Sequence, residues 1–190
     1  MGHVVIDMSM SLDGFIAAPN DTPGQGLGED GMRLHSWMFD DPSVFEKVFG
    51  NLVEETGAVI MGRRSYDNSI EEWGGKGPLD QVPCFVITHD PPPTAGPVFT
   101  FVTDGVEAAL ARARELAGDK RIGLMGADVE RQFLAAGLVD EIRIHLVDVL
   151  LGDGRRLFER LPERIELEQT GLSETDGVTH LEYRVRNGAG

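Results

Sequence analysis

The sequence predicts a single α/β domain, residues 1–190, with a mixed, mostly parallel sheet flanked by helices. Short apolar runs bounded by glycine and proline alternate with amphipathic helical segments over most of the chain. That alternation is typical of parallel strands joined by helices. Near the C-terminus, polar and apolar residues instead alternate on both sides of Asp176-Gly177, which predicts an antiparallel hairpin.

The individual elements follow from their patterns in chain order. Strands are expected at residues 4–10, 58–61, 82–88, 98–102, 122–125 and 141–151. Helices are expected at residues 41–53, from Gly62 onward, at 104–116 and at 128–136. Asp104 and Glu107 predict a capping pair for the third helix. Residues 19–31 form a loop, and loops this long in a compact domain are typically functional or mobile.

Composition and charge exclude several classes of protein. The chain has 17 Lys and Arg against 32 Asp and Glu, a formal charge of −15. Such a charge repels nucleic-acid backbones and anionic lipid, so we expect neither as a partner. The single cysteine, Cys84, cannot form an internal disulfide, and the sequence has no apolar run of membrane-spanning length. We therefore expect a cytoplasmic protein that acts on a small molecule.

Familiar catalytic motifs are missing from the sequence. It contains no phosphate-binding Gly-x-x-x-x-Gly-Lys-Ser/Thr, no His-Glu-x-x-His and no Gly-x-Ser-x-Gly. The glycines at 24, 26 and 28 lie in a polar loop rather than between a strand and a helix, so they do not form a dinucleotide fingerprint. The sequence also lacks a cluster of paired Cys and His residues of the kind that would predict a metal site.

Three predicted strand ends carry residues that suit an anionic nucleotide. They are Met61-Gly62-Arg63-Arg64-Ser65, Ile87-Thr88-His89 and Leu124-Met125-Gly126-Ala127-Asp128-Val129. Helix starts present free backbone N–H groups to an anion, and arginine adds bidentate phosphate contacts. Each segment alone could be an ordinary turn or a solvated face. Because the carboxyl ends of parallel strands meet at one edge of a sheet, their recurrence favours one shared site.

Several segments together resemble the dihydrofolate reductase superfamily. They are Met10-Ser11-Leu12-Asp13-Gly14-Phe15-Ile16-Ala17, Met61-Gly62-Arg63-Arg64-Ser65-Tyr66, Ala136-Gly137-Leu138-Val139-Asp140-Glu141 and Leu150-Leu151-Gly152-x-Gly154. The closer likeness is to the branch that contains the C-terminal reductase domain of bacterial riboflavin biosynthesis and its stand-alone relatives. It runs from Val4 to about Val185 and implies a dihydrofolate-reductase-like three-layer fold.

The resemblance also implies an NADPH site. Residues that would line its nicotinamide end are Met8, Ser9, Ile16 and Ala17. Residues that would hold its phosphates are Gly62, Arg63, Arg64 and Ser65 in the first turn, and Met125, Gly126, Ala127, Asp128 and Val129 in the second. Residues that would lie near the adenosine ribose and its 2′-phosphate are Ile87, Thr88 and His89.

Two positions depart from the family pattern. The family usually has consecutive glycines at the second turn, where this chain has Met125-Gly126. Asp128 stands where the folate enzyme often carries a cation, and we expect it to be a helix N-cap instead. Because of these departures, the protein could instead be a relative that binds a nucleotide or another ligand but has lost catalytic turnover.

The reaction also needs a proton source and a substrate-binding surface. By position, the resemblance places the folate enzyme's carboxylate near Glu46, although Glu46 could instead be a surface charge. Asp13 could face the site or serve as a turn residue. His35 offers a group that can carry a proton, and Trp37 offers a stacking face for a planar ring. A structural histidine is the simpler interpretation of His35.

The sequence therefore predicts an NADPH-dependent reductase of a small planar heterocycle or carbonyl compound. Its specific form, implied by the resemblance, is 5-amino-6-(5-phosphoribosylamino)uracil reduction. The alternatives are the binding relative without turnover and dihydrofolate reductase itself. The apolar run Ile142–Leu151 could pair or pack across a two-fold axis, so we also expect a homodimer.

Overall fold

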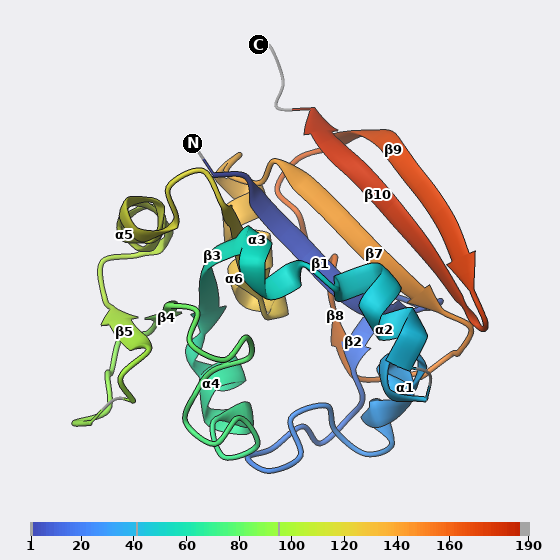
Figure 1. Ribbon diagram of the computed structural model, residues 1–190, viewed down its shortest axis with the longest axis horizontal. Helices are drawn as coiled ribbons and strands as arrows, with labels where there is room; N and C mark the ends of the chain where they lie inside the picture. The colour runs from blue at the N-terminus through green and yellow to red at the C-terminus, as the bar shows by residue number, and fades with distance from the viewer. Residues whose placement is uncertain (1, 41, 95, 187–190) are drawn as a thin grey trace.

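The computed structural model describes residues 2–40, 42–94 and 96–186, and an eight-stranded sheet forms its centre (Figure 1). The strands lie in the order β5-β4-β3-β6-β1-β7-β10-β9. Their bounds are β1 Val4–Ser11, β3 Thr56–Gly62, β4 Cys84–Ile87, β5 Phe99–Val102, β6 Arg121–Met125, β7 Glu141–Val147, β9 Glu166–Thr175 and β10 Val178–Arg186. The strands from β5 to β7 are parallel, and β10 and β9 are added antiparallel, so the predicted mixed, mostly parallel sheet is confirmed.

Helices cover both faces of the sheet. In Figure 1, α1, α2 and α3 cross in front of it and α6 lies behind. The helices are α1 Ser36–Phe39, α2 Pro42–Phe49, α3 Leu52–Glu55, α4 Arg63–Ser69, α5 Val106–Ala117 and α6 Ala127–Ala135, with a 3-10 turn η1 at Gly31–Leu34. None of the helices in the described ranges is long and apolar enough to cross a membrane.

The two faces of β1 differ in chemistry because side chains alternate along a strand. Val4 and Ile6 join the large core with buried residues of α5 and α6. Ser9 points to the opposite face, where its register partner is His145 of β7. Buried residues of η1, α1, β7 and β10 form a smaller apolar cluster on that side: Leu34, Trp37, Val147 and Val178.

The C-terminal hairpin is confirmed, with β9 and β10 paired on either side of the turn Asp176-Gly177. A separate two-stranded sheet joins β2 Phe15–Ala17 to β8 Arg155–Arg156. Between β2 and η1, residues 18–30 contain no helix or strand apart from an isolated bridge between Thr22 and Gln25, as the long predicted loop requires.

Three local expectations were wrong. The helix expected at 41–53 is interrupted at Gly50-Asn51, giving α2 and α3. Asp104 does not cap α5: Gly105 is the N-cap residue, without a side-chain bond, and the Asp104 carboxylate pairs with Arg112 at 3.2 Å. The long strand expected to reach residue 151 ends at Val147.

Candidate functional site

The ends of β3 and β6 lie against each other, as the sequence predicts for two phosphate-binding turns. Gly62 ends β3 and leads into α4, while Gly126 follows β6 and is the N-cap residue of α6. A Cβ atom on Gly126 would overlap the Ser65 hydroxyl, and one on Gly62 would touch Val129 Cγ2 at 3.4 Å. The turn at Gly126 therefore leaves room for Ser65 only because it contains a glycine.

The end of β4 joins the same group. Ile87 pairs with Gly62, and the Arg63 guanidinium donates a hydrogen bond to the backbone carbonyl of Asp90, just beyond β4. Thr88 is buried and its Oγ1 accepts a bond from the Asp90 N–H at 3.2 Å, whereas His89 is exposed. The structure thus brings the three predicted strand ends together at one edge of the sheet.

Both arginines of this edge have carboxylate partners within the chain. Arg63 Nε donates to Asp67 Oδ1 at 2.8 Å, one turn along α4. Arg64 Nε donates at 2.7 Å to Asp21 Oδ2, in the loop that follows β2. The arginine side chains are 34% and 55% exposed respectively, so part of each remains in contact with solvent.

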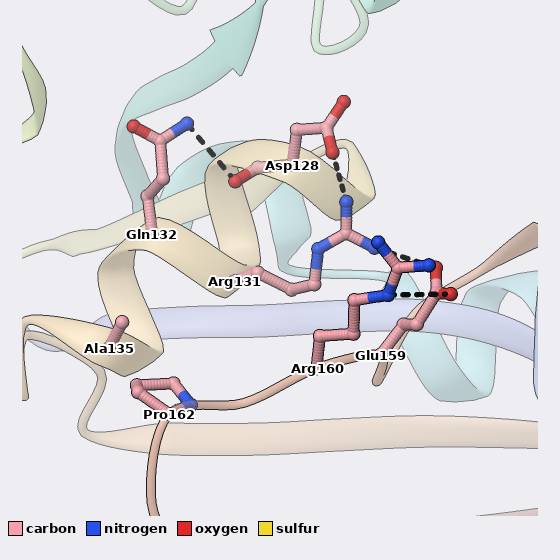
Figure 2. A pocket seen from close by; sticks show the side chains of 7 residues that line it. All are labelled: Asp128, Arg131, Gln132, Ala135, Glu159, Arg160 and Pro162. Atoms are coloured by element: carbon pink, nitrogen blue, oxygen red, sulfur yellow. Dashed lines mark hydrogen bonds and ion pairs between the residues drawn. The ribbon is translucent and has the colours of Figure 1, made fainter.

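Asp128 has a different role from the expected N-cap. Gly126 holds the cap position, and Asp128 lies in the first turn of α6. Figure 2 shows its carboxylate turned toward Arg131, with which it forms an ion pair. Arg131 also reaches Glu159 at 3.7 Å across a hollow of about 380 Å³ between α6 and the segment before β9. The partner cation offsets the charge of Asp128 beside the second turn.

The four residues expected at the nicotinamide end do not all face the same side of the sheet. Met8 and Ser9 are consecutive on β1 and therefore point to opposite faces of the sheet. The Ser9 hydroxyl is buried and accepts a bond from the Trp37 indole N–H at 3.2 Å. Ile16 and Ala17 are buried in β2, next to β8. At most one residue of the β1 pair can present its side chain to a single ligand ring.

Trp37 does not offer an open stacking face. It is 6% exposed, and its ring packs against the rings of His145, His180 and Phe49 at centroid distances of 4.9, 5.1 and 5.7 Å. Its N–H group bonds within the protein. The expectation that Trp37 stacks on substrate is therefore not supported, because the apolar cluster of η1, α1, β7 and β10 already covers the ring.

Asp13 has a structural environment. Its carboxylate accepts hydrogen bonds from Ser11 Oγ at 2.6 Å, Gly152 N at 2.7 Å and Leu151 N at 3.1 Å. These bonds, that of Ser11 above all, lower its pKa to about 2. An aspartate held ionised in this way ties the β1–β2 turn to the segment after β7 and does not suit the role of proton donor at neutral pH.

His35 and Glu46 are in environments that differ from those expected of a proton source. Burial, together with the charge of His145, lowers the pKa of His35 to about 4, and its Nδ1 is buried without a hydrogen-bond partner. Glu46 is exposed on α2 and lines a polar cavity of about 200 Å³ with Arg121 and Arg143. Those arginines lie near the starts of β6 and β7, so Glu46 faces the opposite end of these strands from Gly126.

Two groups of polar residues were not predicted. Asp21 binds Arg64 and lies near Arg155. Separately, a buried chain crosses four neighbouring strands: Asp7 Oδ1 to His145 Nε2 at 2.8 Å, His145 Nδ1 to His180 Nδ1 at 2.7 Å, and His180 Nε2 to Thr175 Oγ1 at 2.8 Å. The histidines at 145 and 180, each within a predicted strand, were the available signal for it. These bonds satisfy polar groups beneath Trp37.

The architecture and its strand-end site define a class of protein, an α/β domain with the dihydrofolate reductase fold. A dihydrofolate reductase from Enterococcus faecalis, solved with NADP(H), superposes with a TM-score of 0.62 at 16% identity, covering 97% of this chain and 96% of that one. The expected three-layer fold is therefore confirmed.

Two further solved structures are similar to the chain. A protein ascribed to riboflavin biosynthesis, from Shewanella sp. PV-4, matches with a TM-score of 0.78 at 24% identity, covering 98% of this chain and 99% of that one. A second is a diaminohydroxyphosphoribosylaminopyrimidine deaminase/5-amino-6-(5-phosphoribosylamino)uracil reductase from Thermotoga maritima. It matches with a TM-score of 0.66 at 16% identity, covering 97% of this chain and 57% of that one. The model of the RibD C-terminal domain matches residues 2–181, so the chain belongs to that family.

Proposed function

We propose that this protein is an NADPH-dependent reductase that transfers hydride to a small planar heterocycle or carbonyl compound. The observation that carries the proposal is the meeting of three strand ends at one edge of the sheet. Arg63 and Arg64 lie there, ion-paired with Asp67 and Asp21, and supply guanidinium donors to an anion in a chain whose formal charge is −15. Membership of the RibD C-terminal family supports the same reaction class.

The residues at this edge fit a dinucleotide. Within 4 Å, a Cβ on Gly62 would meet Val129 alone, so a ligand can approach the Gly62 backbone closely. We assign Gly62–Ser65 and Gly126–Val129 to the phosphates, Ile87–His89 to the adenosine ribose, and Ile16 and Ala17 to the nicotinamide end. When bound, the nicotinamide supplies the hydride. The protein's part is to orient the cofactor beside the acceptor and to exclude water.

The family suggests a specific substrate. The Thermotoga relative is a 5-amino-6-(5-phosphoribosylamino)uracil reductase, and we propose an aminopyrimidine of that kind as the first compound to test. A dihydropterin is the second, because the Enterococcus neighbour is a dihydrofolate reductase.

The test is NADPH oxidation, followed at the nicotinamide absorbance band, with an aminopyrimidine, a dihydropterin and a panel of carbonyl compounds. Consumption of NADPH that requires one of these acceptors is the expected result. Failure of NADPH and NADH to bind at millimolar concentration would remove the reductase proposal.

A nucleotide-binding relative without turnover is the second candidate. It is favoured by the lack of a proton donor among the three expected residues: Asp13 is held ionised, burial keeps His35 neutral, and Glu46 faces the opposite end of the strands. NADPH binding without oxidation across the whole panel would favour this candidate over the reductase.

The homodimer and the cytoplasmic location stay predictions. Strand pairing through β7 cannot form the dimer, because β7 is already hydrogen-bonded on both edges, to β1 and to β10. Packing through the exposed Leu150, just beyond β7, remains available. Sedimentation would test it, and a species of only about one chain mass, 20.7 kDa, would contradict the dimer.

A further inference from the structure

Asp21 lies in the loop after β2, and its carboxylate is bound at the start of α4. Arg64 donates from Nε to Asp21 Oδ2 and from Nη2 to Oδ1, both at 2.7 Å, and Nη2 also reaches the Asp21 carbonyl at 2.9 Å. Asn68 Nδ2 donates to Oδ2 at 3.2 Å, and Arg155 Nη2 lies 3.5 Å from Oδ1. Two guanidinium groups and an amide, contributed by α4 and β8, thus surround one carboxylate.

The partners hold Asp21 as an anion inside the protein. Its side chain is 12% exposed, and such burial alone would raise its pKa. The hydrogen bond from Arg64 and the charges of Arg155 and Arg64 outweigh burial and hold the pKa of Asp21 below its ordinary value. Arg155 Nε is buried and has no partner. The cluster therefore has a donor that Asp21 does not use.

The geometry of this cluster is that of a receptor for a phosphoryl or carboxylate group. Bidentate donation by a guanidinium is the usual way in which proteins bind either anion. Arg64 also immediately precedes Ser65, which touches the Gly126 turn, and the charge of Asp128 acts on it. The receptor therefore adjoins the strand ends to which we assign the cofactor phosphates.

We propose that Arg64, Arg155 and Asn68 form an anion-binding subsite that Asp21 occupies in the ligand-free protein, and that a phosphate group of the incoming ligand displaces Asp21. The inference rests on the proposed function for the identity of that ligand. Because the Nε and Nη2 donors of Arg64 cannot bind both anions in the same way, Asp21 competes with the ligand. Asp21 therefore sets the affinity, and its release frees the loop.

The loop has few other attachments to α4. Gly24 N donates to the Asn68 carbonyl at 3.2 Å, and Thr22 and Gln25 bond to each other within the loop. Loss of the Asp21 contacts thus removes the main tie between residues 20–25 and α4. Occupancy of the subsite by an external anion should loosen this part of the loop.

The direct test is calorimetric titration with inorganic pyrophosphate, for the wild-type protein, Asp21→Asn and Glu29→Gln. Glu29 is the matched control: it lies in the same loop, its replacement changes the net charge equally, and its carboxylate accepts a hydrogen bond from Asn20 Nδ2. We expect Asp21→Asn to bind pyrophosphate about tenfold more tightly, the ratio that corresponds to one well-formed charged contact, and Glu29→Gln to match wild type. Equal affinities in all three proteins would overturn the proposal, as would no binding by any of them.

A second measurement uses the wild-type protein, so it does not depend on how the variants fold. Hydrogen exchange of residues 20–25 should become faster at saturating pyrophosphate, because the loop loses Asp21 as an anchor. Unchanged or slower exchange would overturn the displacement. Titrations with adenosine 2′-phosphate and with ribose 5-phosphate identify the source of the anion. If Asp21→Asn binds adenosine 2′-phosphate more tightly than wild type does, the anion comes from the cofactor. If it binds ribose 5-phosphate more tightly, the anion comes from the substrate.

The same variants separate this inference from the proposed function. If Asp21→Asn strengthens pyrophosphate binding while no variant binds NADPH, the subsite stands and the reductase proposal falls. If NADPH is bound and oxidised while wild type and Asp21→Asn bind pyrophosphate equally, the reductase stands and the competition by Asp21 falls.

Discussion

The Ser65 hydroxyl occupies the place that a Cβ atom would need on Gly126. The two candidate phosphate-binding turns can therefore pack this closely because Gly126 has no side chain. Gly126 also has a φ of 99°, a region that L side chains rarely adopt. Contact and backbone conformation both require glycine at this position.

Gly126→Ala should therefore disturb both turns at once. We expect a loss of roughly 1–3 kcal/mol in the free energy of unfolding, from overpacking together with backbone strain. Gly123→Ala, in the strand β6 that precedes this turn, is the control, because its Cβ would meet only Val59 Cγ2, at 4.0 Å. Urea unfolding of the two variants checks the difference, and equal stability would show that the contact with Ser65 is easily relieved.

Glu130 should make the protein less stable as the pH rises. It is completely buried on α6 with neither carboxylate oxygen hydrogen-bonded, and burial raises its pKa to about 8. Between about pH 4.5 and 8 the folded state holds a proton that the unfolded state releases, so stability falls with rising pH, by at most about 1.4 kcal/mol per pH unit.

Glu130→Gln should remove that slope, since glutamine does not titrate. Unfolding free energies measured between pH 5 and 8 check this, with the exposed Glu115→Gln as the control that retains the slope. Parallel curves for wild type and Glu130→Gln would contradict the assignment.

His35 should have the opposite effect at lower pH. Its pKa is lowered to about 4 in the folded protein, mainly by burial. Between about pH 6.5 and 4 the unfolded state therefore binds more protons, and stability falls as the pH falls. His35→Gln should flatten this acid limb, whereas His3→Gln, at an exposed position, should not. Thermal unfolding at pH 4.5 and 6.5 distinguishes the two, and an unchanged acid limb in His35→Gln would refute the prediction.

Much of the fold could be predicted because its signals are local. The apolar run around residues 82–88 predicted β4, and the alternation around Asp176-Gly177 predicted the hairpin of β9 and β10. The capping of α5 was not predictable in the same way. Asp104 has a suitable side chain, but it pairs with Arg112, two turns into the helix, and leaves the cap to Gly105.

The candidate site was predictable in part for the same reason. Gly62–Ser65 and Gly126–Val129 are short motifs at strand ends, and parallel pairing of β3 with β6 brings them together. Asp21 could not be found in this way, because its partners Arg64 and Arg155 are 43 and 134 positions away. The substrate-facing roles of Trp37 and Glu46 depended on the path of α1 and α2 over the sheet, which no local pattern specifies.

Binding of the cofactor phosphates by Arg63 and Arg64 is central to the proposed function. The most direct measurement is titration of wild type, Arg63→Ala/Arg64→Ala and the control Arg112→Ala, on α5, with NADPH and NADH by fluorescence. We predict that the double variant loses roughly 10- to 100-fold in affinity for NADPH, as expected for lost charged hydrogen bonds, and much less for NADH, while the control is unchanged. Equal losses for the two cofactors would show that these arginines do not read the 2′-phosphate, and unaltered NADPH affinity in the double variant would contradict the cofactor site itself.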